Sequence, residues 1–279
     1  MPGRANLLPA MSSLATERTR TAVADHVATV TLARPDKHNA LDRAMFEGIA
    51  AAAAEIAVTP GVRAVVLHGE GPSFCSGLDV GSFLADGPNG FDILLDREGP
   101  RQANLAQRVA TDWLDLPMPV IAAIHGNCFG GGLQIALGAD IRIAGPDAKL
   151  SVMEARWGLV PDMGITQTLT RMVPIDVAKE LTFTARRLSG EQAAALGLVT
   201  QVADDPLAAA QELAAEIAAK SPDAVRAAKK LYEKAWPAPS ADALELETEL
   251  QRGLMGSPNQ MEAVRAGMAQ ESANFVDPS

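Results

Sequence analysis

The sequence has little cysteine, with Cys75 and Cys128 the only two in 279 residues. Two thiols are too few for a disulfide framework or a tetrahedral cysteine site, which favours a reducing compartment. The histidines show no metal-like spacing either, so we expect no bound metal. No apolar stretch reaches the length of about 18 residues that a membrane-spanning helix needs. The first 17 residues also lack the apolar segment of a signal peptide. These absences predict a soluble cytoplasmic protein without membrane contact.

Positive charge is also scarce, with 24 lysines and arginines against 34 acidic residues and a net charge of -10. Nucleic acids bind basic surfaces, so we expect no nucleic-acid partner. A small ligand that carries phosphate stays compatible, because a few local cations can hold it. Apolar residues make up 48% of the chain and charged residues 21%, which is enough to bury a core.

The pattern divides the chain into three parts. Residues 1–20 mix proline, serine and threonine and predict a flexible, unordered leader. Residues 21–200 alternate strand patterns, such as those at 26–32 and 62–67, with helical ones, which predicts an α/β core. Residues 201–279 contain four helical stretches and predict a helical C-terminal region. Two of these stretches begin with Ser-Pro, a cap followed by proline in the first helical position.

Several local signals predict where elements begin and end. Asp42 is expected to cap a helix over 44–56, and Ser189 to form a capping box with Gln192. Residues 81–103 have the composition of a mobile loop or lid, with Gly, Pro and Asp among scattered apolar residues.

Three consecutive glycines, Gly130 to Gly132, stand between an apolar run at 119–124 and a helical pattern. Glycines let a ligand approach the backbone closely. The first amides of a helix lack internal partners and carry the positive end of its dipole. This turn can therefore present bare donors to a developing negative charge. The alternative is a tight strand-to-helix turn that needs only flexibility.

A second stretch of the same kind lies upstream, at 71–80, and again follows an apolar strand pattern. With both turns in view, the sequence resembles the crotonase superfamily, the enoyl-CoA hydratase/isomerase family. The resemblance runs from about residue 20 to about residue 270. It rests on the following motifs in their order and spacing: Arg34-Pro35, Asn39-Ala40-Leu41, Phe74 to Asp79, Gly126 with Gly130 to Gly132, and Ser189 to Val199.

The resemblance implies an α/β fold, a spiral of ββα units with C-terminal helices that form a homotrimer or a dimer of trimers. It also implies that the N–H groups of Leu78 and Gly131 form an oxyanion hole for the thioester oxygen of an acyl-CoA. One such donor is typically worth about 3–4 kcal/mol to the transition state. Coenzyme A is then part of the substrate, and no separate cofactor is expected. The implied substrate-binding residues are Lys37, Ser76, Gly77, Leu78, Asp79, Gly130, Gly131 and Gln134.

Two positions decide the expected chemistry. Hydratases of the family carry a glutamate just past the glycine triplet and a second at the later Met-Glu position, whereas this chain has Gln134 and Glu154. Adding water across a double bond uses a base and an acid, and an amide exchanges no proton near neutral pH. We therefore expect double-bond isomerisation of an enoyl-CoA with Glu154 as the acid/base. The alternatives are a hydratase of fatty-acid β-oxidation and an acyl-CoA-binding protein with little catalysis.

Asp162 lies eight residues after Glu154, as a catalytic aspartate does in the dienoyl-CoA isomerases of the family. It also follows Pro161, which suits an N-cap of a helix beginning at Met163. Both roles stay open. Gln134 has the alternative of a helix residue that hydrogen-bonds its surroundings, and Glu154 that of a solvated turn residue.

Overall fold

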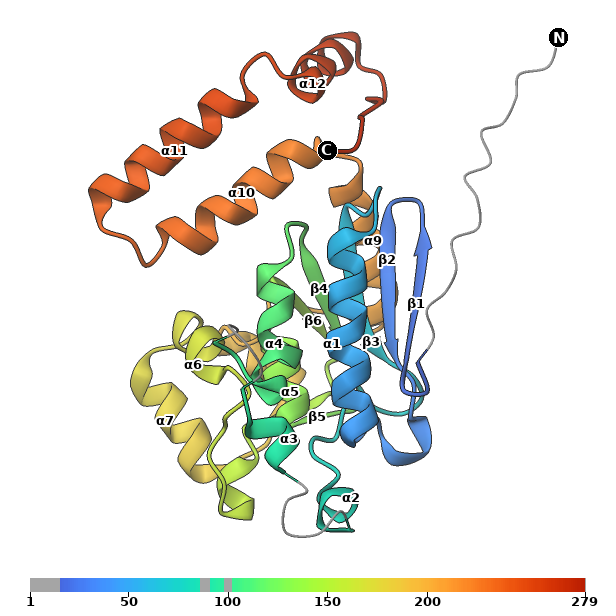
Figure 1. Ribbon diagram of the computed structural model, residues 1–279, viewed down its shortest axis with the longest axis vertical. Coiled ribbons are helices and arrows are strands. Elements are labelled where there is room, and N and C mark those ends of the chain that lie inside the picture. The colour runs from blue at the N-terminus through green and yellow to red at the C-terminus, as the bar shows by residue number, and fades with distance from the viewer. Residues whose placement is uncertain (1–15, 86–90, 98–101, 279) are drawn as a thin grey trace, which may run out of the picture.

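The structure, a computed structural model, describes residues 16–85, 91–97 and 102–278. Its centre is a six-stranded sheet in the order β1-β2-β3-β4-β6-β9 (Figure 1). β1 and β2 form an antiparallel hairpin, and every later neighbour is parallel. The strands are β1 (Thr19–Ala24), β2 (Val27–Leu32), β3 (Ala64–Gly69), β4 (Val120–Ile124), β6 (Ile141–Ala144) and β9 (Gln201–Val202).

A second, three-stranded sheet contains β5 (Asn127–Phe129), β7 (Lys149–Ser151) and β8 (Leu188–Ser189). The chain visits the two sheets in turn, so β4 of the large sheet is followed by β5 of the small one and then by a helix, α5 (Gly131–Leu137). This is the strand–strand–helix repetition that the resemblance implies. The glycines do not directly follow the apolar run at 119–124, because β5 lies between β4 and Gly130. The chain passes from β5 through Gly130 into α5, which is a tight strand-to-helix turn.

Helices pack on both faces of the large sheet because its central strands are apolar on both faces. In β3, Val65 and Leu67 belong to the main core with α1 (Arg43–Val58) and α4 (Leu105–Asp115). Ala64 and Val66 face the other way and pack with α9 (Pro206–Ala218). The remaining helices of this part are α2 (Val80–Ala85), α3 (Asp92–Leu95), α6 (Ile165–Thr168), α7 (Ile175–Thr184) and α8 (Gly190–Ala195), with short 3-10 turns η1 (Pro35–Lys37), η2 (Glu154–Trp157) and η3 (Leu169–Arg171).

The predicted caps are confirmed. The Asp42 side chain accepts a hydrogen bond from the Met45 N–H at the start of α1. Ser189 and Gln192 form a reciprocal capping box at α8. Each cap satisfies amides that the helix leaves without internal partners.

Two predictions about irregular segments need correction. The leader was placed at residues 1–20, but β1 begins at Thr19 and pairs with β2; residues 1–15 lie outside the described residues. The segment 81–103, predicted as a loop or lid, is helical through Ala85 and again in α3. The rest of that prediction falls partly on 86–90 and 98–101, which also lie outside the described residues.

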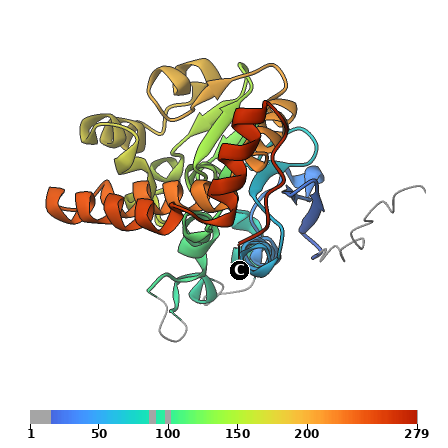
Figure 2. The ribbon, with the colours of Figure 1, turned by 90° about the horizontal axis from the view of Figure 1, so that it is seen from above.

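The C-terminal helices α10 (Pro222–Ala235), α11 (Ser240–Leu254) and α12 (Pro258–Ala269) lie at one end of the molecule (Figure 1). α10 and α11 run side by side across that end (Figure 2). Lys229 ties α10 to the core, because its ammonium donates to Asp140 at 2.8 Å and to two backbone carbonyls. Among the described residues, none of α11 is buried as a whole, and in α10 this holds of Pro222 alone. Large apolar side chains stay exposed along these helices: Tyr232, Trp236, Leu244, Met255 and Met268. No helix among the described residues is long and apolar enough to cross a membrane.

We expect these apolar side chains to be covered by neighbouring copies of the chain, so that the protein forms trimers or multiples of them. Light scattering at micromolar concentration measures the mass. Leu244→Glu places a charge on α11 and is expected to lower the average mass, because burying an unpaired charge is costly. Val58→Glu, at an exposed position at the end of α1, serves as the matched control. A monomeric wild-type protein would contradict this expectation.

Candidate active site at the two glycine turns

The two glycine-bearing turns lie side by side. The backbone of Cys75 donates to the Asn127 carbonyl and accepts from the Phe129 N–H, both at 3.0 Å. The Phe74 N–H donates to the His125 carbonyl at 2.8 Å, so the upstream segment pairs with the chain that enters the glycine triplet. Stretches about 50 residues apart therefore meet at one place, as the resemblance implies.

Two glycines make this close contact possible. A Cβ atom on Gly132 would lie 2.4 Å from the Cys75 carbonyl oxygen, and one on Gly126 would lie 2.0 Å from the Pro72 carbonyl oxygen. Both distances are far below van der Waals contact, and both neighbours are backbone atoms. Glycine is needed here so that the two turns can approach each other.

The amides of Leu78 and Gly131 make no hydrogen bond within the described part of the chain. Leu41 binds the backbone on either side of Leu78, because its N–H donates to the Gly77 carbonyl and its carbonyl accepts from the Asp79 N–H. In such an extended pairing the Leu78 N–H faces away from Leu41. Gly131 is the first residue of α5, where an N–H has no partner inside the helix.

The same two amides are near one another. A Cβ atom on Gly77 would lie 3.8 Å from the Gly131 nitrogen and 2.8 Å from the Phe129 carbonyl oxygen. Gly77 adopts φ +91°, a backbone conformation that favours glycine. Gly77, the residue before the Leu78 amide, therefore lies close to the Gly131 amide, and the binding of an anionic oxygen by these two donors stays a prediction.

The Arg34 to Leu41 segment holds the upstream turn in place. Asn39 is fully buried; its side chain accepts from the Arg34 N–H and donates to the carbonyls of Glu70 and Ser73. Arg34 in turn pairs with Asp79 at 2.8 Å. The Arg34 to Leu41 motif on which the resemblance rests therefore supports the turn that contains Leu78.

The predicted substrate-binding side chains divide into two groups. The Asp79 carboxylate is used inside the protein, where it binds Arg34 and accepts from the Ser82 N–H at the start of α2. Partial burial raises the pKa of Asp79, but the hydrogen bond from Arg34 and other favourable contacts outweigh it, so that the pKa is lowered overall. Ser76 donates its hydroxyl to the Lys37 carbonyl at 3.3 Å, and Lys37 itself is exposed at the end of η1. The Lys37 ammonium is therefore accessible to an anionic ligand.

Glu154 is buried beside the glycine triplet, with 8% of its surface exposed. A Cβ atom on Gly130 would lie 3.2 Å from its Oε1. The same Oε1 accepts a hydrogen bond of 2.6 Å from Gln134 Nε2, while Oε2 has no partner among the described residues. The alternative of a solvated turn residue is excluded by this burial.

Burial is the largest influence on Glu154 and raises its pKa. The hydrogen bond from Gln134 works in the opposite direction, and the charge of Asp162 adds to the rise. A raised pKa suits a carboxyl group that must both take up and release a proton near neutral pH.

Asp162 is not the N-cap that its place after Pro161 suggests. The next helix, α6, begins two residues later than expected, and Gly164 in a left-handed conformation stands at its N-cap with no side-chain hydrogen bond. Asp162 is an exposed residue whose pKa is raised, chiefly by partial desolvation of its carboxyl group. Its charge adds to the rise in the pKa of Glu154. Asp162 directly precedes Met163, whose N–H donates to the same Gln134 side chain that binds Glu154.

The other reactive side chains near the turns are engaged or inert. His125 Nε2 lies 2.9 Å from the Gly71 carbonyl oxygen, as expected for a hydrogen-bonded histidine. Cys75 and Cys128 are fully buried, and burial raises the pKa of Cys75 to about 12 and that of Cys128 well above its usual range. Neither thiol can serve as a nucleophile in this state. The described residues contain no cluster of side chains suited to a metal ion.

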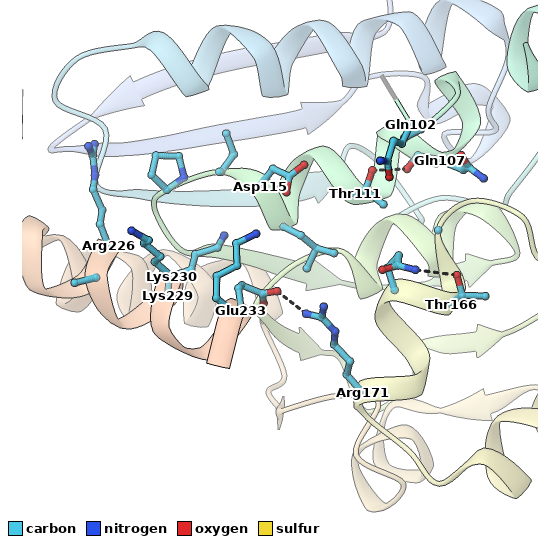
Figure 3. A pocket seen from close by; sticks show the side chains of 18 residues that line it. Gln102, Gln107, Thr111, Asp115, Thr166, Arg171, Arg226, Lys229, Lys230 and Glu233 are labelled. Atoms are coloured by element: carbon cyan, nitrogen blue, oxygen red, sulfur yellow. Dashed lines mark hydrogen bonds and ion pairs between the residues drawn. The ribbon is translucent and has the colours of Figure 1, made fainter. Parts of the chain in front are cut away.

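A cavity of about 900 Å³ lies between α4, the α6 region and α10 (Figure 3). Cationic side chains from α10 line it, including Arg226, Lys229 and Lys230, and the ion pair of Arg171 with Glu233 spans one side. Glu154 and the two free amides do not line this cavity. The cavity is therefore separate from the candidate site at the two turns.

Comparisons with known proteins show which family the chain resembles. The sequence profile described as enoyl-CoA hydratase/isomerase matches residues 22–276. A Δ(3,5)-Δ(2,4)-dienoyl-CoA isomerase of Rattus norvegicus is 37% identical over 223 residues, which cover 75% of this chain and 66% of the relative. A short-chain-enoyl-CoA hydratase of Clostridium acetobutylicum is 32% identical over 243 residues, covering 86% of this chain and 90% of the relative. The solved structure of an enoyl-CoA hydratase from Bacillus anthracis superposes with a TM-score of 0.83 at 29% identity, covering 93% of this chain and 99% of that one.

The burial of Glu154 predicts a stability effect. Glu154→Gln is expected to raise the free energy of unfolding at pH 8 by on the order of 1 kcal/mol, because it removes a buried charge with one unpaired oxygen. The folded-state pKa is raised, so the folded protein takes up a proton before the unfolded chain does as the pH falls. As the pH falls, the free energy of unfolding of the wild type therefore rises relative to that of the variant. The difference in stability between the two proteins is expected to be smaller at acidic pH than at pH 8. Urea unfolding at pH 8 and pH 5 measures both. A variant that is less stable at pH 8 would contradict the account.

Proposed function

Because the chain belongs to the enoyl-CoA hydratase/isomerase family of enzymes, we propose that its reaction is the double-bond isomerisation of an enoyl-CoA thioester. The observation that carries the proposal is the pair at the glycine turn, where one buried carboxylate, Glu154, meets an amide, Gln134. One group that exchanges protons is sufficient to move a double bond, whereas hydration calls on both a base and an acid.

The proposed reaction begins with the thioester oxygen bound to the N–H groups of Leu78 and Gly131. Glu154 removes a proton from the α-carbon of a 3-enoyl-CoA, and the electron pair of that C–H bond delocalises as a dienolate over the thioester and the double bond. The negative charge on oxygen is stabilised by the two amides. The protonated Glu154 then returns the proton to the γ-carbon, which gives the 2-enoyl-CoA and regenerates the carboxylate.

Dienoyl-CoA isomerisation is a second candidate, because Asp162 provides another carboxyl group in the segment that Gln134 links to Glu154. A proton removed at one end of a diene must be delivered further along it, and a second carboxyl group can do so. The identity with a relative that is named a dienoyl-CoA isomerase supports this candidate. Hydration, with Gln134 in place of a second glutamate, is the less favoured alternative. An acyl-CoA-binding role with little catalysis is the alternative of another class.

We further propose a cytoplasmic homotrimer or dimer of trimers. The exposed apolar side chains of the tail support the assembly, and the two free thiols suit a reducing compartment. The CoA phosphates of the substrate are proposed to meet Lys37, which is exposed beside the upstream turn.

The first test follows the absorbance of the wild-type protein with a 3-enoyl-CoA and with crotonyl-CoA. We expect isomerisation of the first and little hydration of the second. Glu154→Gln is expected to lose about 10²- to 10⁴-fold in kcat on the 3-enoyl-CoA, the usual contribution of general-base assistance. KM should change little, because the thioester is bound by backbone amides. A fully active Glu154→Gln would refute the assignment, and a wild-type protein silent on every substrate would favour the binding role.

A second test addresses Asp162. Asp162→Asn removes the charge and keeps the size, and no cap hydrogen bond is lost with it. For a dienoyl-CoA isomerase we expect a large loss of kcat on a 3,5-dienoyl-CoA and little change on a 3-enoyl-CoA. Equal activity of the variant and the wild type on both substrates would remove Asp162 from the mechanism. Thermal unfolding of the variant is the control for folding.

A further inference from the structure

The side chain of Gln134 is buried in α5 and uses both ends of its amide group. Its Oε1 accepts a hydrogen bond of 2.9 Å from the Met163 N–H, and its Nε2 donates to Glu154 Oε1 at 2.6 Å. A backbone N–H can only donate, so it requires the oxygen of the amide on its side. The NH₂ group is thereby directed at Glu154.

The two oxygens of Glu154 are not equivalent as a result. Oε1 lies beside Gly130 and is held by Gln134, whereas Oε2 is buried and without a partner among the described residues. A buried carboxylate oxygen without a donor is costly and is typical of a group that acts on a ligand. The oxygen that is free to take a proton is therefore Oε2.

We propose that Gln134 is a positioning residue that holds Glu154 through Oε1, so that Oε2 is the atom that exchanges the proton with the substrate. The role of Oε2 in proton exchange rests on the proposed function. The contact between Gln134 and Glu154 does not depend on that function. Gln134 acts in two ways: it fixes the side-chain torsions of Glu154, and it stabilises the ionised form by a charge-assisted hydrogen bond.

A glutamate at position 134 could not play this part in the same way. Two carboxylates at the separation of 2.6 Å now seen between Nε2 and Oε1 cannot both be ionised, so one proton would be shared between them. Glu154 would then titrate as half of a coupled pair. Because the Gln134 amide does not titrate, Glu154 is the one titratable group of this pair.

Among side chains, Gln134 is the largest influence on the pKa of Glu154; burial and the backbone N–H of Glu154 itself come before it. Asp162 is the carboxylate that acts on Glu154, and α5 carries no titratable side chain. Apart from Glu154 itself, the charged residues of η2 and of the packed helix α7 are exposed: Arg156, Asp176, Lys179 and Glu180.

The experiment compares wild type with Gln134→Met, which keeps the length of the side chain and removes both hydrogen bonds. On the 3-enoyl-CoA we expect kcat to fall about 10- to 100-fold, the worth of a hydrogen bond to a charged group, with KM little changed. The acidic limb of the pH profile of kcat/KM should move to higher pH, because the ionised form of Glu154 has lost its donor.

An infrared titration of the Glu154 carboxyl band provides a readout without turnover. The band is assigned by its disappearance in Glu154→Gln, and its midpoint should move to higher pH in Gln134→Met. Gln107→Met is the matched control, because Gln107 closes the capping box of α4 and does not contact Glu154. It is expected to lower stability and to leave both the pH limb and the band unchanged.

Each outcome is decisive. A folded Gln134→Met with an unchanged pH limb and an unchanged carboxyl band overturns the proposal. A shifted band in a protein that is inactive on every enoyl-CoA keeps the contact and refutes the proposed function. If Gln134→Met does not fold, Gln134→Glu decides: two separate carboxyl midpoints support the contact, and a single unshifted midpoint overturns it.

Discussion

The candidate site depends on one close approach of backbone to backbone, between the segment at Cys75 and the chain that enters the glycine triplet. The hydrogen bonds of Cys75 to Asn127 and Phe129 hold two turns in register. The absence of a side chain at Gly132 lets α5 begin against the Cys75 carbonyl. This contact places the segment that contains Leu78 beside the start of α5, the helix that carries Gln134.

The sequence was sufficient for those parts of the fold that depend on local chemistry. Asp42 and the Ser189 box are caps whose partners lie three residues away, so spacing alone predicts them. β3 could be predicted as a strand from the apolar pattern at 62–67. The two glycine turns could be recognised because each glycine-bearing stretch follows an apolar strand pattern, and the family that they suggested is confirmed.

The parts that the sequence did not disclose depend on partners far along the chain. β5 is three residues long and has no pattern of its own; it exists because β7 pairs with it. The Asp162 cap was wrong because Gly164 can adopt the left-handed conformation that starts α6. The contact of Gln134 with Glu154 spans 20 residues and needs the Met163 amide to direct it, and no local pattern indicates such a three-way arrangement.

The burial of Cys75 and Cys128 also has a practical consequence. Both thiols sit in the bridge that joins the two turns, fully covered and with raised pKa values. An alkylating reagent attacks only an exposed thiolate, so labelling can proceed only when this bridge separates. The rate of labelling therefore measures how often the contact between the two turns opens, and the native cysteines serve as the probe.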